Sequence, residues 1–253
     1  MRQRTRALLK PHWPAPPGVV ALSSTREGGV SEGVYASLNM GDHVGDKPAS
    51  VAQNRAIVLS HLPAAARIQW LSQVHGVDVL AADDNTVGDA PRADASVTRT
   101  AGVFLAIMSA DCLPVLFCDR HGSVVGAAHA GWRSLLGGVL ENTVAAMNVP
   151  PGDILAWFGP AISAAAFEVG AEAREAFVAH SDASACAFKA HGDRFLADLS
   201  ALARQRLSAL GVVNCSDSGL CTFAEPERFF SHRRDGQTGR MVSLVGLSAC
   251  ANP

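Results

Sequence analysis

The sequence has 253 residues, 48% of them hydrophobic, and a formal net charge of −2, which suits one domain with a sizeable core and gives no basic field that would attract nucleic acid. It contains no apolar stretch of about 18 residues that could cross a membrane, and its first residues lack the apolar core of a signal peptide. The six cysteines form no Cys-x-x-Cys pair, so we expect a reduced, cytoplasmic protein with a single domain over residues 1–253.

The first part of the chain predicts an irregular start, a strand, a glycine loop and a helix. Residues 1–17 contain several prolines and form an irregular N-terminal segment, whereas residues 19–23 are typical of a strand. Arg26 lies in the glycine loop directly after this strand, a position that favours an anion-binding role. A helix is expected over residues 48–59, because a proline suits its first turn and apolar residues recur at helical spacing.

Three apolar runs dominate the middle of the chain. They span residues 103–108, 115–118 and 123–128. Each run suits a buried strand, and turn-forming residues 119–122 join the last two into a predicted hairpin. Continued along this hairpin, the pairing places Cys112 opposite His129, with Cβ atoms about 4.5–5.5 Å apart on one face. A slip of one residue would put the two side chains on opposite faces.

The second half of the chain predicts helices between short strands. Apolar residues recur at helical spacing over residues 132–147, and the first turn of this helix would favour an anion close to Cys112 and His129. The remaining predictions are helices over residues 171–179 and 199–210, a loop over residues 180–192, and strands over residues 154–158, 212–215 and 241–247. This mixed order of strands and helices favours an α+β fold over a regular βαβ sheet.

His75 is a third residue of interest, because it ends a predicted strand over residues 68–74. Together with Cys112 and His129 it could be a packing residue, although Asp111 beside the cysteine argues against this. One thiolate and two imidazoles also suit zinc, and three protein ligands leave the fourth position open, as in catalytic sites. Alternatively, Cys112 is a nucleophile, His129 its base and Asp111 the group that orients the base. Spacing alone does not separate the metal site from the nucleophile.

Specific motifs occur at the ends of the predicted elements. They are Gln73-Val74-His75-Gly76, Ala110-Asp111-Cys112-Leu113-Pro114 and His129-Ala130-Gly131-Trp132-Arg133, with further motifs over residues 25–31, 37–41, 43–46, 159–162 and 233–236. Together and in this order they resemble the laccase-domain family of bacterial proteins, also called the peptidoglycan-editing-factor or polyphenol-oxidase family. The resemblance extends over nearly the whole chain.

The resemblance implies both a fold and an activity. The implied fold is a single domain with α-helical layers outside two mixed β-sheets, an α/β/β/α arrangement. The implied activity is that of a purine nucleoside enzyme with His75, Cys112 and His129 as zinc ligands. It would phosphorolyse adenosine, inosine and S-methyl-5'-thioadenosine and deaminate adenosine. The alternative is a cysteine hydrolase in peptidoglycan precursor editing, with Cys112 and His129 as nucleophile and base.

Purine nucleosides and phosphate are the implied partners, with neither nucleic acid nor a membrane involved, and we expect a monomer. Arg26 and Arg133 are the candidates to bind phosphate, with Arg233 and Arg234 as second choices. Asn39 is the candidate to bind the nucleoside. Asp111 is the candidate acid beside the metal.

True laccase chemistry is not expected. The four coppers of a multicopper laccase need many histidines, often in His-x-His pairs, whereas this chain has nine histidines and no such pair. Copper binding at the Cys/His group is expected only as adventitious, because copper exceeds zinc in affinity for such ligands.

Overall fold

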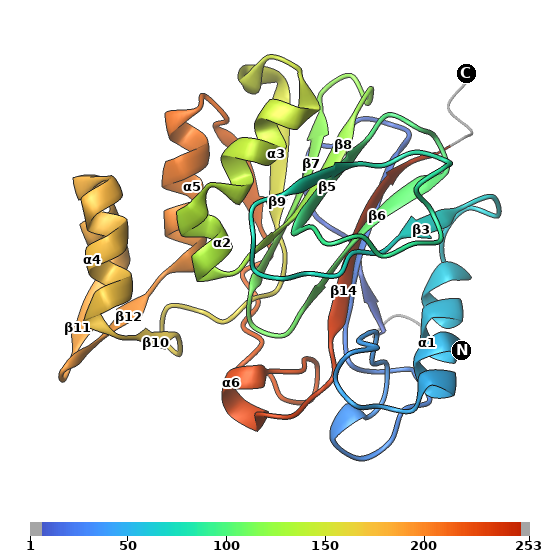
Figure 1. The fold of residues 1–253 in the computed structure, drawn as a ribbon, viewed down its shortest axis with the longest axis horizontal. Helices are drawn as coiled ribbons and strands as arrows, with labels where there is room; N and C mark the ends of the chain where they lie inside the picture. Colours follow the sequence, from blue (N-terminus) through green and yellow to red (C-terminus); the bar gives the residue numbers. More distant parts are fainter. Residues whose placement is uncertain (1–6, 249–253) are drawn as a thin grey trace.

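Two mixed β-sheets packed face to face form the centre of the protein (Figure 1). The structure is a computed structural model that describes residues 7–248. The first sheet has five strands in the order β1 (Leu8–Leu9), β2 (Val19–Ser24), β14 (Met241–Leu247), β6 (Val103–Ser109) and β3 (Arg67–Gln69). The second has six strands in the order β13 (Asn214–Asp217), β9 (Ile154–Phe158), β7 (Leu113–Asp119), β8 (Val125–Ala130), β5 (Ala95–Thr98) and β4 (Val79–Ala81).

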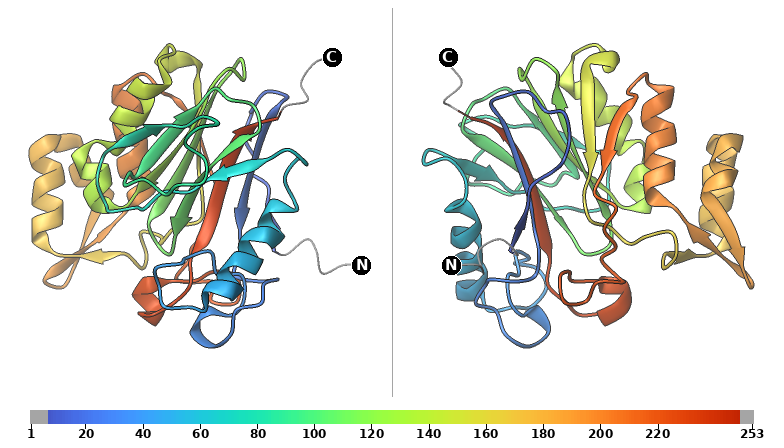
Figure 2. Two further views of the ribbon diagram at one scale, coloured as in Figure 1. Left: turned by 45° about the vertical axis from the view of Figure 1, so that its right-hand side comes forward. Right: turned by 180° about the vertical axis from the view of Figure 1, so that it is seen from behind.

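Helices cover the outer faces of both sheets (Figure 2). The first sheet is covered by α1 (Pro48–Leu59), and the second by α2 (Trp132–Gly137), α3 (Val139–Met147) and α5 (Leu199–Ala209). Farther out lie α4 (Ala171–His180) and a small sheet of β10 (Glu168–Val169), β12 (Arg194–Ala197) and β11 (Phe188–His191). The remaining helices are α6 (His232–Asp235) and three short 3-10 turns at Gly33–Tyr35, Pro151–Asp153 and Asp182–Ala187. The predicted α+β fold with mixed sheets is confirmed.

The central strands are apolar on both faces because each is covered on both sides. In β6, Leu105 and Ile107 lie in the core between the two sheets, whereas Phe104 packs in the core beneath α1. In β7, Leu116 points between the sheets and Phe117 points toward the helices of the second sheet. The apolar runs predicted as buried strands are therefore the central strands of the fold.

The hairpin of β7 and β8 has a different register from the predicted one. Pro114, not Cys112, lies opposite His129. The loop is longer than predicted because Asp119 caps it, and its carboxylate accepts hydrogen bonds from three backbone N–H groups within residues 121–124. The shift is two residues, so each side chain stays on its predicted face.

The predicted strand over residues 68–74 is wrong beyond Gln69, where β3 ends. The side chain of Gln73 forms two hydrogen bonds of 2.8 Å with the backbone of Met108, one to its carbonyl oxygen and one from its N–H. These two bonds take the place of those that a neighbouring strand would form. The main chain therefore leaves the sheet here and carries His75 to the end of β6.

Three other predictions also need correction. The helix over residues 132–147 is broken between α2 and α3, since Gly138 adopts a φ of 102° that ends the first helical segment. The predicted loop over residues 180–192 contains a 3-10 turn and β11. The predicted irregular start holds β1, which pairs with β2, while residues 1–6 of that prediction lie outside the described chain.

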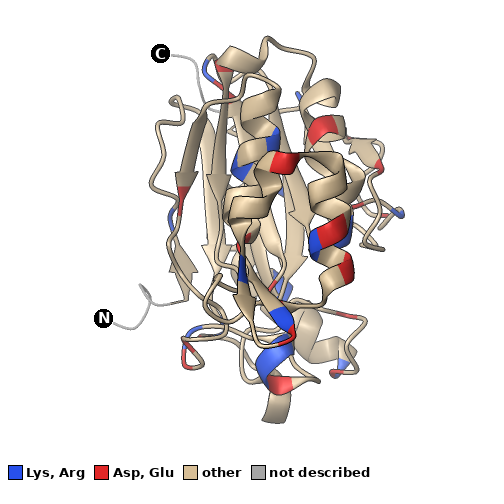
Figure 3. Cartoon of the chain, turned by 90° about the vertical axis from the view of Figure 1, so that its left-hand side faces the viewer, with Lys and Arg blue, Asp and Glu red and all other residues tan. Residues whose placement is uncertain are grey.

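Acidic and basic residues are interspersed on the face that carries α4 and α5 (Figure 3). Of the helices within residues 7–248, none is long and apolar enough to cross a membrane. The five cysteines of the same part of the chain are free thiols.

Candidate metal centre

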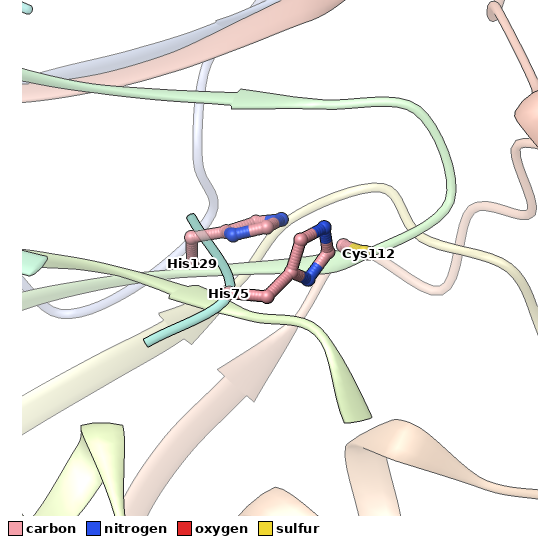
Figure 4. A group of neighbouring side chains, drawn as sticks. All are labelled: His75, Cys112 and His129. Carbon is pink, nitrogen blue, oxygen red and sulfur yellow. The ribbon is translucent and has the colours of Figure 1, made fainter. Parts of the chain in front are cut away.

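His75, Cys112 and His129 converge at one end of the space between the two sheets (Figure 4). His75 follows β3 on the segment held by Gln73, Cys112 lies in the bend between β6 and β7, and His129 is near the end of β8. One nitrogen of each imidazole and the Cys112 sulfur all lie within 4.8 Å of one another. The structure therefore brings together the three residues that the resemblance implied as ligands.

Asp94, directly before β5, connects two of these three residues. The carboxylate is fully buried and accepts hydrogen bonds from the backbone N–H groups of Val74, His75 and Gly76. It also accepts a bond of 2.9 Å from Nδ1 of His129. The sequence analysis missed Asp94, and the one available signal was a carboxylate that opens an apolar strand.

The close approach of the donor atoms requires a glycine at position 131. A Cβ atom at Gly131 would lie 2.9 Å from Nδ1 of His75 and 3.0 Å from Sγ of Cys112. One thiolate and two imidazoles form a soft to borderline donor set that fits zinc, with copper as a competitor. The residues present thus fit a metal ion of this kind.

Nearby charges act on the two imidazoles in opposite directions. Burial opposes a charge on His129, but the nearby Cys112 and the Asp94 carboxylate outweigh it and raise the pKa of His129 to about 9. Burial and the neighbouring His129 lower the pKa of His75. A metal cation at this group therefore competes with a proton on His129.

The group opens into a cavity of about 220 Å³. The cavity is lined by His43, Gln73, His75, Met108, Ser109, Ala110, Cys112, His129, His232 and Arg240. Among the described residues, Arg240 is the one Lys or Arg in this lining. A larger cavity of about 960 Å³ lies beside α5 and includes none of the three ligand-type residues, so size alone does not mark the site.

Arg240 reaches the cavity because β14 pairs with β6. Met241 lies opposite Ser109, which places Arg240 beside the bend that carries Cys112. One guanidinium nitrogen donates to the carbonyl oxygens of Thr238 and Gly239. Burial lowers the pKa of Arg240, and the nearby Cys112 and Asp111 partly oppose this. The sequence analysis did not identify this residue.

Two of the predicted binding residues are held elsewhere by internal contacts. Arg26 donates to the carbonyl oxygens of Ala36 and Pro226 and does not line the cavity. Asn39 is buried, and its Oδ1 accepts a hydrogen bond from the backbone N–H of Arg240. Asn39 therefore contacts a residue of the cavity without lining it.

The other two predicted residues, Arg133 and Asp111, do not line the cavity either. Arg133 is exposed in the first turn of α2, and its guanidinium stacks on Trp132. Asp111 turns away from the cavity, and its carboxylate accepts bonds of 2.7 Å from the Thr222 hydroxyl and from the backbone N–H of Arg233. These bonds tie α6 to the bend before β7.

The second-choice arginines, Arg233 and Arg234, bind main-chain carbonyls. Arg233 donates to Glu168, and Arg234 donates to three carbonyl oxygens within residues 222–229 and pairs with Asp235. Neither lines the cavity.

Comparison with known proteins gives consistent matches over the whole fold. A family model described as multi-copper polyphenol oxidoreductase laccase matches residues 20–248. Purine nucleoside phosphorylase YfiH of Escherichia coli (strain K12) is 52% identical over 240 residues, which cover 95% of this chain and 98% of that protein.

Two solved structures share the fold. Protein NMB0706 of Neisseria meningitidis superposes with a TM-score of 0.93 at 51% identity, over 96% of this chain and 100% of that one. YlmD of Geobacillus stearothermophilus superposes with a TM-score of 0.91 at 34% identity, over 98% of each chain. On these matches, the chain belongs to the laccase-type family that the family model describes.

Proposed function

We propose that this chain is a zinc-dependent purine nucleoside enzyme that phosphorolyses adenosine, inosine and S-methyl-5'-thioadenosine and deaminates adenosine. The observation that carries the proposal is the convergence of His75, Cys112 and His129 on a cavity that also holds Arg240. The name of the E. coli relative, which is 52% identical, supports the choice of nucleoside and phosphate as substrates.

The three converging side chains would hold the metal ion, which when bound supplies a positive charge that polarises the substrate beside it. In phosphorolysis, a phosphate oxygen bonds to C1′ of the ribose while the bond from C1′ to the purine nitrogen breaks. From adenosine or inosine the products are ribose 1-phosphate and the purine base, which takes the proton that the phosphate gives up; S-methyl-5'-thioadenosine would give the 5-methylthio sugar phosphate instead. Arg240 would bind the phosphate, because a guanidinium pairs well with phosphate oxygens.

The remaining parts of the proposal follow from the same site. Arg133 would assist phosphate binding from the first turn of α2, whereas Asn39 would act by holding the backbone of Arg240. Copper would bind only as a competitor of zinc. We further propose one laccase-type domain over residues 1–253, acting as a monomer in the cytoplasm, where free thiols persist.

The test combines metal analysis of the purified protein with product analysis of adenosine incubations, with and without phosphate. Zinc together with phosphate-dependent ribose 1-phosphate is the expected result, with inosine as the second product. Inosine alone would reduce the proposal to a deaminase. Metal-containing protein that forms neither product would contradict the proposal.

We expect Arg240→Ala to raise KM for phosphate about tenfold, since a hydrogen bond to a charged group contributes about 1.5–3 kcal/mol. Initial rates over a range of phosphate concentrations measure this, with Arg240→Lys as the variant that keeps the charge and Arg26→Ala as the control. Arg26→Ala should leave KM for phosphate unchanged, because Arg26 does not line the cavity. The reverse pattern would assign phosphate to Arg26.

A further inference from the structure

We infer that Asp94 is the positioning residue of the metal centre, because its one carboxylate holds both histidines in their metal-binding arrangement. The inference rests on the proposed metal-dependent function. It concerns a residue that lies outside the cavity and would touch neither metal nor substrate.

The two carboxylate oxygens of Asp94 divide their hydrogen bonds between the two histidines. Oδ1 accepts from the His75 N–H at 3.0 Å and from Nδ1 of His129 at 2.9 Å. Oδ2 accepts from the N–H groups of Val74 at 3.0 Å and Gly76 at 2.6 Å. All four partners must donate, because a backbone N–H has no lone pair to offer and an ionised carboxylate has no proton.

For His129, this contact fixes which ring nitrogen faces the other ligands. Since Nδ1 must carry the proton that it donates to Asp94, the lone pair available to a metal is on Nε2. The backbone N–H of His129 also donates to the Asp94 carbonyl oxygen at 2.7 Å. Ring orientation and main-chain position are therefore set by the same residue.

For His75, the contact holds an unfavourable backbone conformation. His75 has a φ of 60°, in the left-handed region that non-glycine residues seldom adopt. Such a conformation persists only where the surroundings hold it, and here three successive N–H groups point at one carboxylate. Loss of these bonds would let the loop relax and move the His75 ring away from Cys112.

The variant Asp94→Asn tests these contacts because an amide has one acceptor oxygen and one NH₂ group. With NH₂ at the Oδ1 position, the His75 N–H loses its acceptor and Nδ1 of His129 must accept a hydrogen bond, so the ring proton moves to Nε2 and blocks the metal. With NH₂ at the Oδ2 position, the N–H groups of Val74 and Gly76 lose their acceptor. Either orientation disturbs at least one of the two histidine ligands.

Asp119→Asn is the matched control. Asp119 is also buried, and its carboxylate likewise accepts three backbone N–H groups, together with the Ser123 hydroxyl. It lies at the opposite end of β7 from Cys112. Its substitution should lower the stability of the fold, because a buried carboxylate that holds a turn is lost, but it should not alter the metal site.

The experiment measures Zn²⁺ affinity against a competing chelator, together with two NMR signals. These are the Nδ1–H proton of His129 in ¹⁵N-histidine-labelled protein and the exchange protection of the Val74 and Gly76 amides. We expect Asp94→Asn to bind Zn²⁺ about 10–100-fold more weakly and to lose one of the two signals. Asp119→Asn should match the wild type in all three measurements.

Unchanged Zn²⁺ affinity and unchanged signals in a folded Asp94→Asn variant would overturn the inference. If that variant does not fold, the wild type still decides, because a His129 ring without a protected Nδ1–H proton would also overturn it. A wild type that binds no Zn²⁺ would contradict the proposed function instead. The Nδ1–H and amide signals of the metal-free protein then still report what Asp94 holds.

Discussion

Replacing Cys112 by alanine is expected to remove zinc from the purified protein and to abolish nucleoside turnover. Cys112 is the one sulfur donor of the group, and its atom lies within 4.8 Å of both imidazole donors. Loss of a residue that only hydrogen-bonds to a metal ligand typically lowers metal affinity about 10–100-fold. Removal of a ligand itself should lower the affinity more. Metal content by elemental analysis and product formation from adenosine and phosphate measure the two effects.

Cys215→Ala is the matched control for this substitution. Cys215 is another free, partly buried thiol, located on β13 and outside the cavity. It should keep wild-type zinc content and turnover. A Cys112→Ala protein that is free of zinc and still fully active would contradict the proposed function.

The same variant does not separate the metal site from a cysteine nucleophile, since both require the thiol. Chelation does separate them. Activity that is lost on chelation and returns with added zinc indicates the metal site. Activity that survives chelation and is lost on thiol alkylation indicates Cys112 as nucleophile with His129 as its base.

The central strands, and the faces on which their side chains lie, could be predicted from the sequence because they depend on local patterns. The apolar run that became β6 is buried on both faces, and alternation decides which residues face the other sheet. The prediction of the hairpin register was wrong because it assumed one tight turn over residues 119–122. Asp119 closes a longer loop, and a side chain that binds several backbone groups leaves no periodic trace in the sequence.

The ligand group could be located from motifs, whereas its surroundings could not. Asp94 and Arg240 reach the site through pairings between segments far apart in the chain, β5 with β8 and β14 with β6. Arg26 follows a strand in sequence, as an anion-binding arginine often does, but its guanidinium is bound by main-chain carbonyls. Arg240 could therefore be identified as the cation of the cavity only once the register of the first sheet was known.

Replacing Gly131 by alanine is expected to lower turnover about 100-fold, because a displacement near 1 Å in a reacting site has roughly this effect. The backbone of Gly131 has φ −61° and ψ 153°, which alanine adopts without strain. The added methyl group alone would therefore cause the change. It would lie 2.9 Å from the His75 ring, closer than real Cβ atoms approach their neighbours, and 3.0 Å from the Cys112 sulfur, closer than nearly all of them do.

The atoms that must yield to this methyl group belong to side chains, not to the main chain, so the fold should survive while the donor atoms move apart. Gly152→Ala is the control, because a Cβ atom there meets no atom within 4 Å. We expect Gly131→Ala to unfold within a few degrees of the wild type in thermal denaturation and yet to bind Zn²⁺ more weakly and turn over adenosine more slowly. A stable Gly131→Ala protein with wild-type zinc affinity would show that the three side chains do not need this close approach, and would weaken their assignment as ligands of one metal ion.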